Sequence, residues 1–306
     1  MDIGYLAQFI LSGIMLGIIY ATVAVGFTLY FGVLDVINFS HGDVLTVGVF
    51  VSLASYLGLQ AAGVQSSAIL LTIMVVASVA SMALLGMIIA KKFVLPLRNS
   101  PPFIILLITL MIGTVIRELV RIFYPSGSNP QSFPALLPEG ATHWGNLIIR
   151  YDSLILIGAG LGVIVLVNLL INRSRIGLAI RAVAQDGETA ALMGISLEWV
   201  VLLVFGIGSG LAVFAGVMNG LYYNEVNFGT GLMLGIIGFC AAVVGGLGNI
   251  YGAILGGFLF ALLQTIVVVA TPTLSVYKDV FAFGMIILIM IIKPSGLLGE
   301  AVSERV

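Results

Sequence analysis

The sequence carries little charge. Asp, Glu, Lys and Arg together make up 8% of its 306 residues, whereas soluble domains carry about a quarter. Hydrophobic residues make up 60%, and the mean hydropathy is +1.22. A chain with so few charges cannot cover a surface that faces water, which excludes a soluble domain and indicates a protein embedded in a membrane. The net charge of −1 gives no indication of a nucleic-acid partner.

Several chemical motifs are also missing. The single cysteine, Cys240, excludes a disulfide framework within the chain. No lysine follows a glycine, so there is no G-x-x-x-x-G-K-[ST] phosphate loop, and any ATP that drives this protein must bind to a separate subunit. HExxH and GxSxG motifs are absent, and the two histidines lie far apart. The sequence therefore predicts neither an enzyme nor a resident metal or cofactor.

What the sequence does contain is a series of long apolar runs. A helix needs about 20 apolar residues to cross the hydrocarbon core of a bilayer. Hydrophobic segments occur at about 6–32, 44–59, 67–90, 103–122, 153–171, 199–222, 232–247, 252–270 and 279–293. They predict an all-α polytopic membrane protein with eight or nine transmembrane segments, forming a single transmembrane domain over residues 1–306. The segments 44–59 and 279–293 are short for a full span, so either is expected to belong to a broken or tilted helix.

The basic residues are divided unevenly between the two sides of the membrane. With nine crossings, one side holds eight of them: Lys91, Lys92, Arg98, Arg173, Arg175, Arg181, Lys293 and Arg305. The other side holds four: Arg117, Arg121, Arg150 and Lys278. Arg117 and Arg121 lie at one end of their predicted helix, and this end is expected to be solvated. Because basic loops stay in the cytoplasm, the distribution predicts a cytoplasmic C-terminus and leaves the side of the N-terminus open.

A polar stretch separates the first two apolar segments. Its polar residues are Asp35, Asn38, Ser40, His41 and Asp43. Polar groups are costly at membrane depth unless they are paired or line a wet cavity. Gly42 permits a helix to end, whereas Asn38, Ser40 or Asp43 can cap a new one. The stretch therefore predicts either an interrupted helix beside a solute path or an ordinary interfacial turn between two spans.

A similar stretch occurs 189 residues further on. Asn38 corresponds to Asn227 and Gly42 to Gly231, with further identities at 39/228, 45/234 and 50/239. Five hydrophobic segments separate the two sites, so the two copies would have opposite orientations. Inverted repeats with interrupted helices are typical of transporters and flank their pathways. The second stretch also contains Glu225, which either attracts a cationic part of a solute or lies in an ordinary interfacial belt.

Two connections are long enough to have functions of their own. The outer loop, at about 123–151, contains four prolines that prevent regular helix; it either links two helices or docks a partner outside the cell. In the inner loop, at about 172–198, Asp186 can cap a helix whose first turn contains Glu188, and Gly194 can end it. This two-turn helix would offer the apolar residues 190–193 and is too short to be stable alone. The loop is either a surface linker or a contact for another subunit.

Four motifs, in this order, resemble those of a known family. They are Ile37-Asn38-Phe39-Ser40-His41-Gly42-Asp43, Arg181 to Asp186 running on to Gly194-Ile195, Gly245-Gly246 to Gly252, and Lys293-Pro294 to Gly299. Each motif alone is weak, but four at fitting separations span most of the chain. Together they resemble the permease family of branched-chain amino-acid ABC importers.

The resemblance implies an inverted-repeat ABC importer permease fold in the bacterial inner membrane, working by alternating access. It implies as partners a second homologous permease subunit, two cytoplasmic ATPase subunits and a periplasmic solute-binding protein. The expected ATPase-coupling residues are Arg181, Ala182, Asp186, Glu188, Ala190 and Gly194. The expected residues beside the translocation path are Asn38, Ser40, His41, Gly42, Asn227 and Gly231.

One residue departs from the pattern of this family. Members that transport branched-chain amino acids usually carry a lysine at the place of Ile237. Urea, amides or other small solutes therefore stay open beside branched-chain or related amino acids. An ATP-independent secondary carrier is the other alternative, although no acid lies mid-span as an obvious proton carrier.

Overall fold

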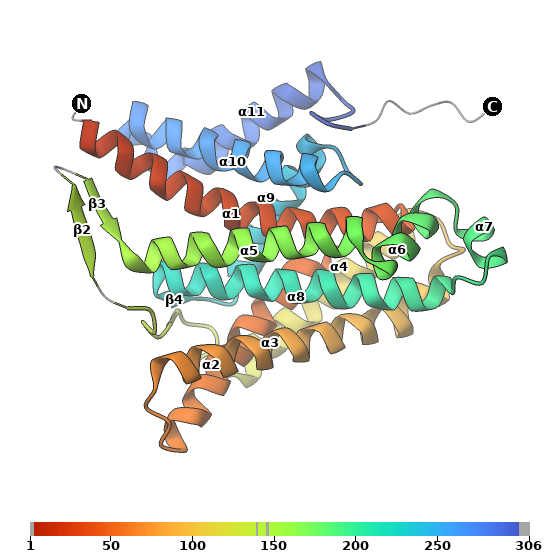
Figure 1. The fold of residues 1–306 in the computed structure, drawn as a ribbon, viewed down its shortest axis with the longest axis horizontal. Helices are drawn as coiled ribbons and strands as arrows, with labels where there is room; N and C mark the ends of the chain where they lie inside the picture. Colours follow the sequence, from red (N-terminus) through yellow and green to blue (C-terminus); the bar gives the residue numbers. More distant parts are fainter. Residues whose placement is uncertain (1–2, 139, 145–146, 300–306) are drawn as a thin grey trace.

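A computed structural model of the chain describes residues 3–138, 140–144 and 147–299. This part of the chain is mostly helical (Figure 1), because backbone in hydrocarbon must satisfy its own hydrogen bonds. Its nine apolar helices are α1 (Ile3–Leu34), α2 (Ser40–Ala61), α3 (Ser67–Ile89), α4 (Pro102–Phe123), α5 (Tyr151–Arg173), α8 (Leu197–Tyr223), α9 (Thr230–Gly245), α10 (Ile250–Ala270) and α11 (Lys278–Ile292). Each coincides with one predicted segment, so the all-α polytopic class is confirmed.

Eight stretches of the described residues are long and apolar enough to span a membrane, and α9, with 16 residues, lies outside these eight. Of the two segments expected to be short, α2 is not, whereas α11 itself has only 15 residues. Helix α2 has 22 residues, and the 3-10 helix η3 (Pro272–Tyr277) extends α11 to a stretch of 21 residues. The expectation was wrong for α2 because its first turn, from Ser40 to Asp43, is polar and yet helical. Hydropathy alone assigns that turn to a loop.

Helices α1 and α8 form the centre of the molecule and are its most deeply buried spans. They run in opposite directions (Figure 1). The start of α1 and the end of α8 lie on the left of the view with the hairpin of β2 (Ala141–Trp144) and β3 (Leu147–Arg150). The distribution of basic residues predicts that this end is the outer one, and that the right-hand end lies in the cytoplasm.

The order of elements occurs twice. Helices α1 to α4 and helices α8 to α11 each comprise a long buried helix, a break and three further helices. Asp35 and Asn224, 189 residues apart, both adopt left-handed backbone, with φ of 51° and 54°. Asn38 and Asn227, also 189 apart, each accept a hydrogen bond from the backbone N–H two residues later, at 3.2 and 2.9 Å. The repeat suggested by five identities therefore extends to the backbone geometry of both breaks.

The connections carry the remaining elements. At the outer end, β1 (Gln131–Ser132) pairs antiparallel with β4 (Glu225–Val226), which fastens the outer loop to the break between α8 and α9. At the inner end lie the π-helical turn η1 (Ala90–Val94), the 3-10 turn η2 (Leu95–Leu97), and helices α6 (Arg175–Gln185) and α7 (Gly187–Leu192). Lys91 Nζ lies 3.9 Å from the Glu198 carboxylate, so the two inner connections adjoin.

Candidate functional site

Four of the five polar residues at the break between α1 and α2 lie in the protein interior, whereas Asp35 is exposed. Asn38, Ser40, His41 and Asp43 are all between 0% and 3% exposed. Asn38 Oδ1 accepts hydrogen bonds from the backbone N–H of Ser40 (3.2 Å) and from its hydroxyl (2.6 Å), which closes a turn at the start of α2. A turn at the membrane surface would be exposed. The part from Asn38 to Asp43 is therefore an interruption buried among the other helices, which favours the interrupted helix over an interfacial turn.

The two breaks meet at a helix crossing. The first turns of α2 and α9 touch at Gly42 and Gly231, where the carbonyl oxygen of each glycine occupies the place of the other's missing Cβ atom. The backbone N–H of Gly231 donates to Thr46 Oγ1 at 3.2 Å. Gly235, which lies 189 residues after Thr46, packs closely against the backbone of Gly42. The contact between Thr46 and Gly231 thus corresponds to the contact between Gly235 and Gly42, as a local two-fold axis between α2 and α9 requires. Asn227, half-buried, lies just before this crossing.

His41 fills the interior behind the crossing. Its ring lies between Phe27 and Tyr30, with centroid distances of 4.6 and 5.2 Å. Nε2 lies 3.3 Å from the Val23 carbonyl, which can only accept, so Nε2 donates and Nδ1 accepts from the Tyr30 hydroxyl at 3.2 Å. Both ring nitrogens have partners. His41 therefore joins α2 to α1 and does not face an opening in this conformation.

Arg117, expected at a solvated helix end, lies mostly in the interior. Its guanidinium is 3.3 Å from the Asp43 carboxylate, and the two side chains are 16% and 3% exposed. By contrast, Glu118 and Arg121 form the partly exposed pair that a helix end suggests, with 2.7 Å between their charged atoms. Sequence reasoning missed the Asp43–Arg117 pair because it depends on the packing of α4 against α2. The available signal was the spacing of Thr109, a glycine at 113 and Arg117 along one face of α4.

The inner segment contains the short capped helix that the sequence predicts. The Asp186 carboxylate accepts hydrogen bonds from the backbone N–H groups of Glu188 (3.0 Å) and Thr189 (3.1 Å) at the start of α7. Gly194, with φ of 85°, ends the segment in left-handed backbone. The predicted cap and the predicted stop are both confirmed.

Helix α6 is fixed to the end of α5. The Arg181 guanidinium donates a hydrogen bond to the Ile171 carbonyl, which satisfies one of the acceptors that a helix end leaves open. Gly177 lies so close to the same carbonyl that a Cβ atom there would overlap it. Arg181, expected as a coupling residue, therefore also holds α6 against the spanning part of the protein.

The apolar face of α7 is smaller than predicted. Ala190 is 5% exposed, and Ala182 is half-buried, so both pack against the protein's own body. Glu188 is exposed, and Leu192 and Met193 are 88% and 80% exposed. The apolar surface offered to a partner therefore consists of Ala191, Leu192 and Met193 and lacks Ala190.

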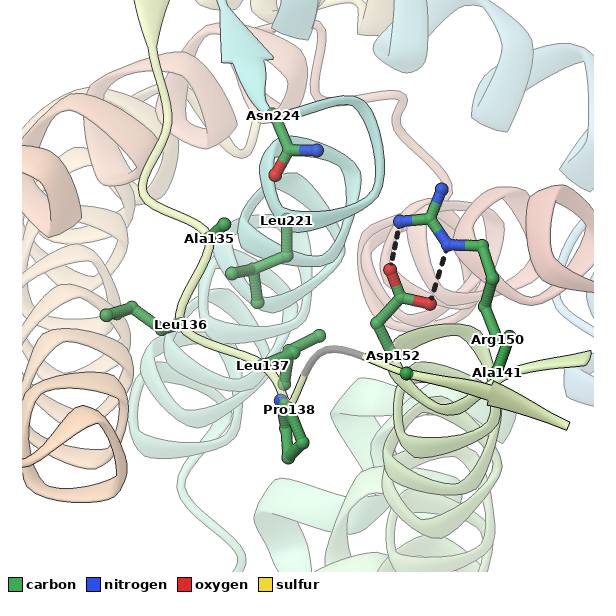
Figure 2. Close-up of a pocket in the computed structure, with 10 residues that line it drawn as sticks. Ala135, Leu136, Leu137, Pro138, Ala141, Arg150, Asp152, Leu221 and Asn224 are labelled. Atoms are coloured by element: carbon green, nitrogen blue, oxygen red, sulfur yellow. Dashed lines mark hydrogen bonds and ion pairs between the residues drawn. The ribbon is translucent and has the colours of Figure 1, made fainter.

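A cavity of about 430 Å³ opens at the outer end of the molecule, between the outer loop, the end of α8 and the start of α5 (Figure 2). Leu137 and Leu221 form part of its apolar wall. Beside them, the Arg150 guanidinium donates two hydrogen bonds to the Asp152 carboxylate. These bonds raise the pKa of Arg150 above its ordinary value. Glu225 does not line this cavity but is exposed in β4.

The fold combines antiparallel spanning helices, two buried interruptions that meet, and an exposed capped helix at one end. These features are typical of a multi-pass membrane transport permease. Comparison with known proteins identifies the family within this class. A family model described as "Branched-chain amino acid transport system / permease component" matches residues 9–290, and the chain belongs to this family.

The relatives match over nearly the whole chain. The sequence is 32% identical to the high-affinity branched-chain amino acid transport system permease protein BraD of Pseudomonas aeruginosa, over 100% of this chain and 99% of that protein. It is 32% identical to the corresponding LivH of Escherichia coli K12, over 99% and 98% of the two chains. It is 26% identical to the probable LivH of Methanocaldococcus jannaschii, over 90% and 87%. No solved structure matches this chain significantly.

Proposed function

We propose that this chain is one of two homologous permease subunits of a bacterial inner-membrane ABC importer for branched-chain or related amino acids. Two cytoplasmic ATPase subunits and a periplasmic solute-binding protein would complete the importer. Family membership supports the class of transporter. The names of the relatives from Pseudomonas aeruginosa and Escherichia coli, which are permeases for branched-chain amino acids, support the solute.

The observation that carries the proposal is the exposed tip of α7. Leu192 and Met193 are large apolar side chains, next to each other, beyond the ends of the spanning helices and therefore outside hydrocarbon. A six-residue helix is not stable alone, and here the Asp186 cap and the buried Ala190 hold it in place. Adjacent apolar side chains presented on a fixed support are typical of a protein contact. We assign this contact to an ATPase subunit.

The same segment is connected to the helix crossing. Helix α7 leads into α8, whose 27 residues rise roughly 40 Å and end at the break before α9. A push on α7 would therefore travel along α8 to the Gly42–Gly231 crossing at the start of α9. Alternating access would follow if this crossing loosens on one side of the membrane while it closes on the other. The residues beside the path would be Asn38, Ser40, Gly42, Asn227 and Gly231.

Ile237, which replaces the lysine usual in this family, lies in the protein interior. Ile237 is 3% exposed in α9, so its apolar side chain contributes to packing and does not line an opening in this conformation. The solute itself is best identified by transport.

Reconstitution into liposomes tests both parts of the proposal. The chain would be purified with its partner permease, ATPase subunits and binding protein, and uptake of labelled leucine, isoleucine, valine, urea and acetamide would be measured. We expect ATP-dependent uptake of the three amino acids. ATP-dependent uptake of urea or acetamide alone would keep the mechanism and replace the solute. Uptake by the chain alone, driven by an ion gradient, would establish a secondary carrier instead.

A variant of the α7 tip tests the coupling contact. Leu192→Glu/Met193→Glu should abolish ATP-dependent uptake and binding of the ATPase subunits while the chain still inserts into the membrane. Ile148→Glu is the control, because Ile148 is 44% exposed in β3 at the outer end, outside the candidate membrane spans, and also gains an exposed glutamate. Wild-type uptake by the double variant would remove the coupling role from α7.

A further inference from the structure

Helix α4 contacts the start of α2 through a single stripe of residues. Thr109 Oγ1 accepts a hydrogen bond from the backbone N–H of Phe39 at 3.2 Å. One turn further, the Asp43 carboxylate occupies the space that a side chain at Gly113 would need. One more turn along, Arg117 forms its ion pair with that carboxylate. Positions 109, 113 and 117 share one face of a helix, so this face docks the start of α2 just before α2 crosses α9.

The stability of this conformation does not explain the ion pair. Asp43 Oδ1 and Arg117 Nη1 are 3.3 Å apart but form no well-aligned hydrogen bond with any group in the described part of the chain. A buried ion pair must offset the removal of two charges from water, and apolar groups of the same volume are often equally stable or more so. Removing only one partner is far more costly, because it leaves an unpaired charge in the interior.

Each charge also has a favourable place when the pair is open. Asp43 lies in the first turn of α2, where the positive end of the helix dipole stabilises a carboxylate. Arg117 lies six residues before Phe123 at the outer end of α4, which is roughly 9 Å of helix. A long arginine side chain can reach the surface over such a distance. Separation of α4 from α2 therefore leaves neither charge stranded in hydrocarbon.

We propose that Arg117 is a positioning residue for transport: its ion pair with Asp43 holds the start of α2 on α4, and the pair opens and re-forms in each transport cycle. This inference rests on the importer function proposed above. While the pair is closed, Gly42 is fixed at its crossing with Gly231. When α4 moves away, the start of α2 is released and the crossing can loosen. Arg117 does not need to touch the solute to act in this way.

The double variant Asp43→Asn/Arg117→Met separates positioning from stability. It removes both charges with little change in volume, so the importer should assemble with the thermal stability of the wild type. Uptake should fall by roughly tenfold or more. ATP hydrolysis should no longer respond to the loaded binding protein, which a purely structural pair would not cause. Arg117→Lys, which keeps the charge, should retain most of the uptake.

Two results would overturn the inference. The first is wild-type uptake and wild-type stimulation of ATP hydrolysis by a stable double variant. The second is a large loss of thermal stability in the double variant, because the pair would then serve the fold. Uptake by the wild-type complex separates this inference from the proposed function: if the wild type shows no ATP-dependent uptake, the importer function itself fails.

The neighbouring pair on the same helix provides the matched control. Glu118 and Arg121 are 37% and 45% exposed, and ion pairs on the surface contribute little to stability. Glu118→Gln/Arg121→Met removes the same two charge types one turn further along α4. This variant should keep uptake within about twofold of the wild type. An equal loss of uptake in both double variants would show that any charge on α4 matters and would contradict a specific role for Arg117.

Discussion

Gly42 and Gly231 touch through their backbones where α2 crosses α9, and each is the counterpart of the other in the 189-residue repeat. Neither position can carry a Cβ atom without overlap with the carbonyl oxygen of the other. Small residues let two helices approach closely within a membrane. This pair of glycines therefore sets how closely the two halves of the repeat approach at their interrupted helices.

Alanine at either glycine should force the two helices apart. We expect Gly42→Ala and Gly231→Ala each to destabilise the protein by about 1–3 kcal/mol, the usual cost of overpacking, and to reduce uptake. Thermal unfolding of the purified chain and uptake in liposomes measure the two effects. Gly158→Ala on α5 is the control, because a Cβ atom there meets nothing within 4 Å. The crossing would lose its importance if all three variants behaved alike.

The cap of α7 gives a prediction about coupling. Asp186→Ala removes the acceptor for the N–H groups of Glu188 and Thr189, at a cost of about 1 kcal/mol. A six-residue helix should fray at that cost, so less ATPase should co-purify and uptake should fall at an unchanged amount of inserted chain. Asp186→Ser keeps a capping oxygen and should retain most of the binding. Equal losses in both variants would show that the charge matters more than the cap.

Features that depend on neighbouring residues could be predicted from the sequence. Asp186 and Gly194 were recognised as the start and end of a short helix because capping involves residues only two or three positions away. The nine apolar segments were recognised because hydrocarbon leaves a long apolar chain few alternatives to a helix. The repeat was recognised from five identities, and the left-handed residues Asp35 and Asn224 now extend it.

Contacts between distant segments could not be predicted in the same way. Within six residues, Asn38 closes a local turn, His41 contacts α1, Gly42 contacts α9, and Asp43 contacts α4. The polar motif shows that these residues need partners, but no spacing within it tells which helix supplies each one. The burial of Ala190 was missed for the same reason, because it depends on how α7 packs against the rest of the protein.

His41 provides a test of whether the polar motif acts through packing or through contact with the solute. His41→Leu removes the hydrogen bonds to the Val23 carbonyl and to the Tyr30 hydroxyl, which then keeps only its contact with Ser209, and this loss should cost about 1–3 kcal/mol. Because the ring does not face an opening, the solute concentration for half-maximal uptake should stay unchanged while the folded amount falls. Tyr30→Phe removes only one of the contacts and should have a smaller effect. A changed half-maximal concentration at normal stability would instead place His41 on the path.

Gln264 provides the last prediction, which concerns the attachment of α11. This helix is the least buried of the spans and buries only Ala282 and Ile286 among its described side chains. Gln264, at 1% exposure in α10, accepts a hydrogen bond from the Tyr20 hydroxyl (3.0 Å) and donates one to Asp279 Oδ1 (2.5 Å) at the start of α11. The side chain thus joins α11 to the central helix α1.

Gln264→Leu should loosen α11 more than any other span. It leaves a buried hydroxyl and a carboxylate oxygen without their partner, at a cost of about 1–3 kcal/mol. Hydrogen exchange should therefore become faster in α11 while α3, which packs against α2 and α8, keeps its protection. Asp279→Asn retains an acceptor for the Gln264 amide and should change exchange much less. If hydrogen exchange in α11 were as fast in the wild type as in Gln264→Leu, the few apolar contacts of α11 would hold it in place, and the Gln264 side chain would not.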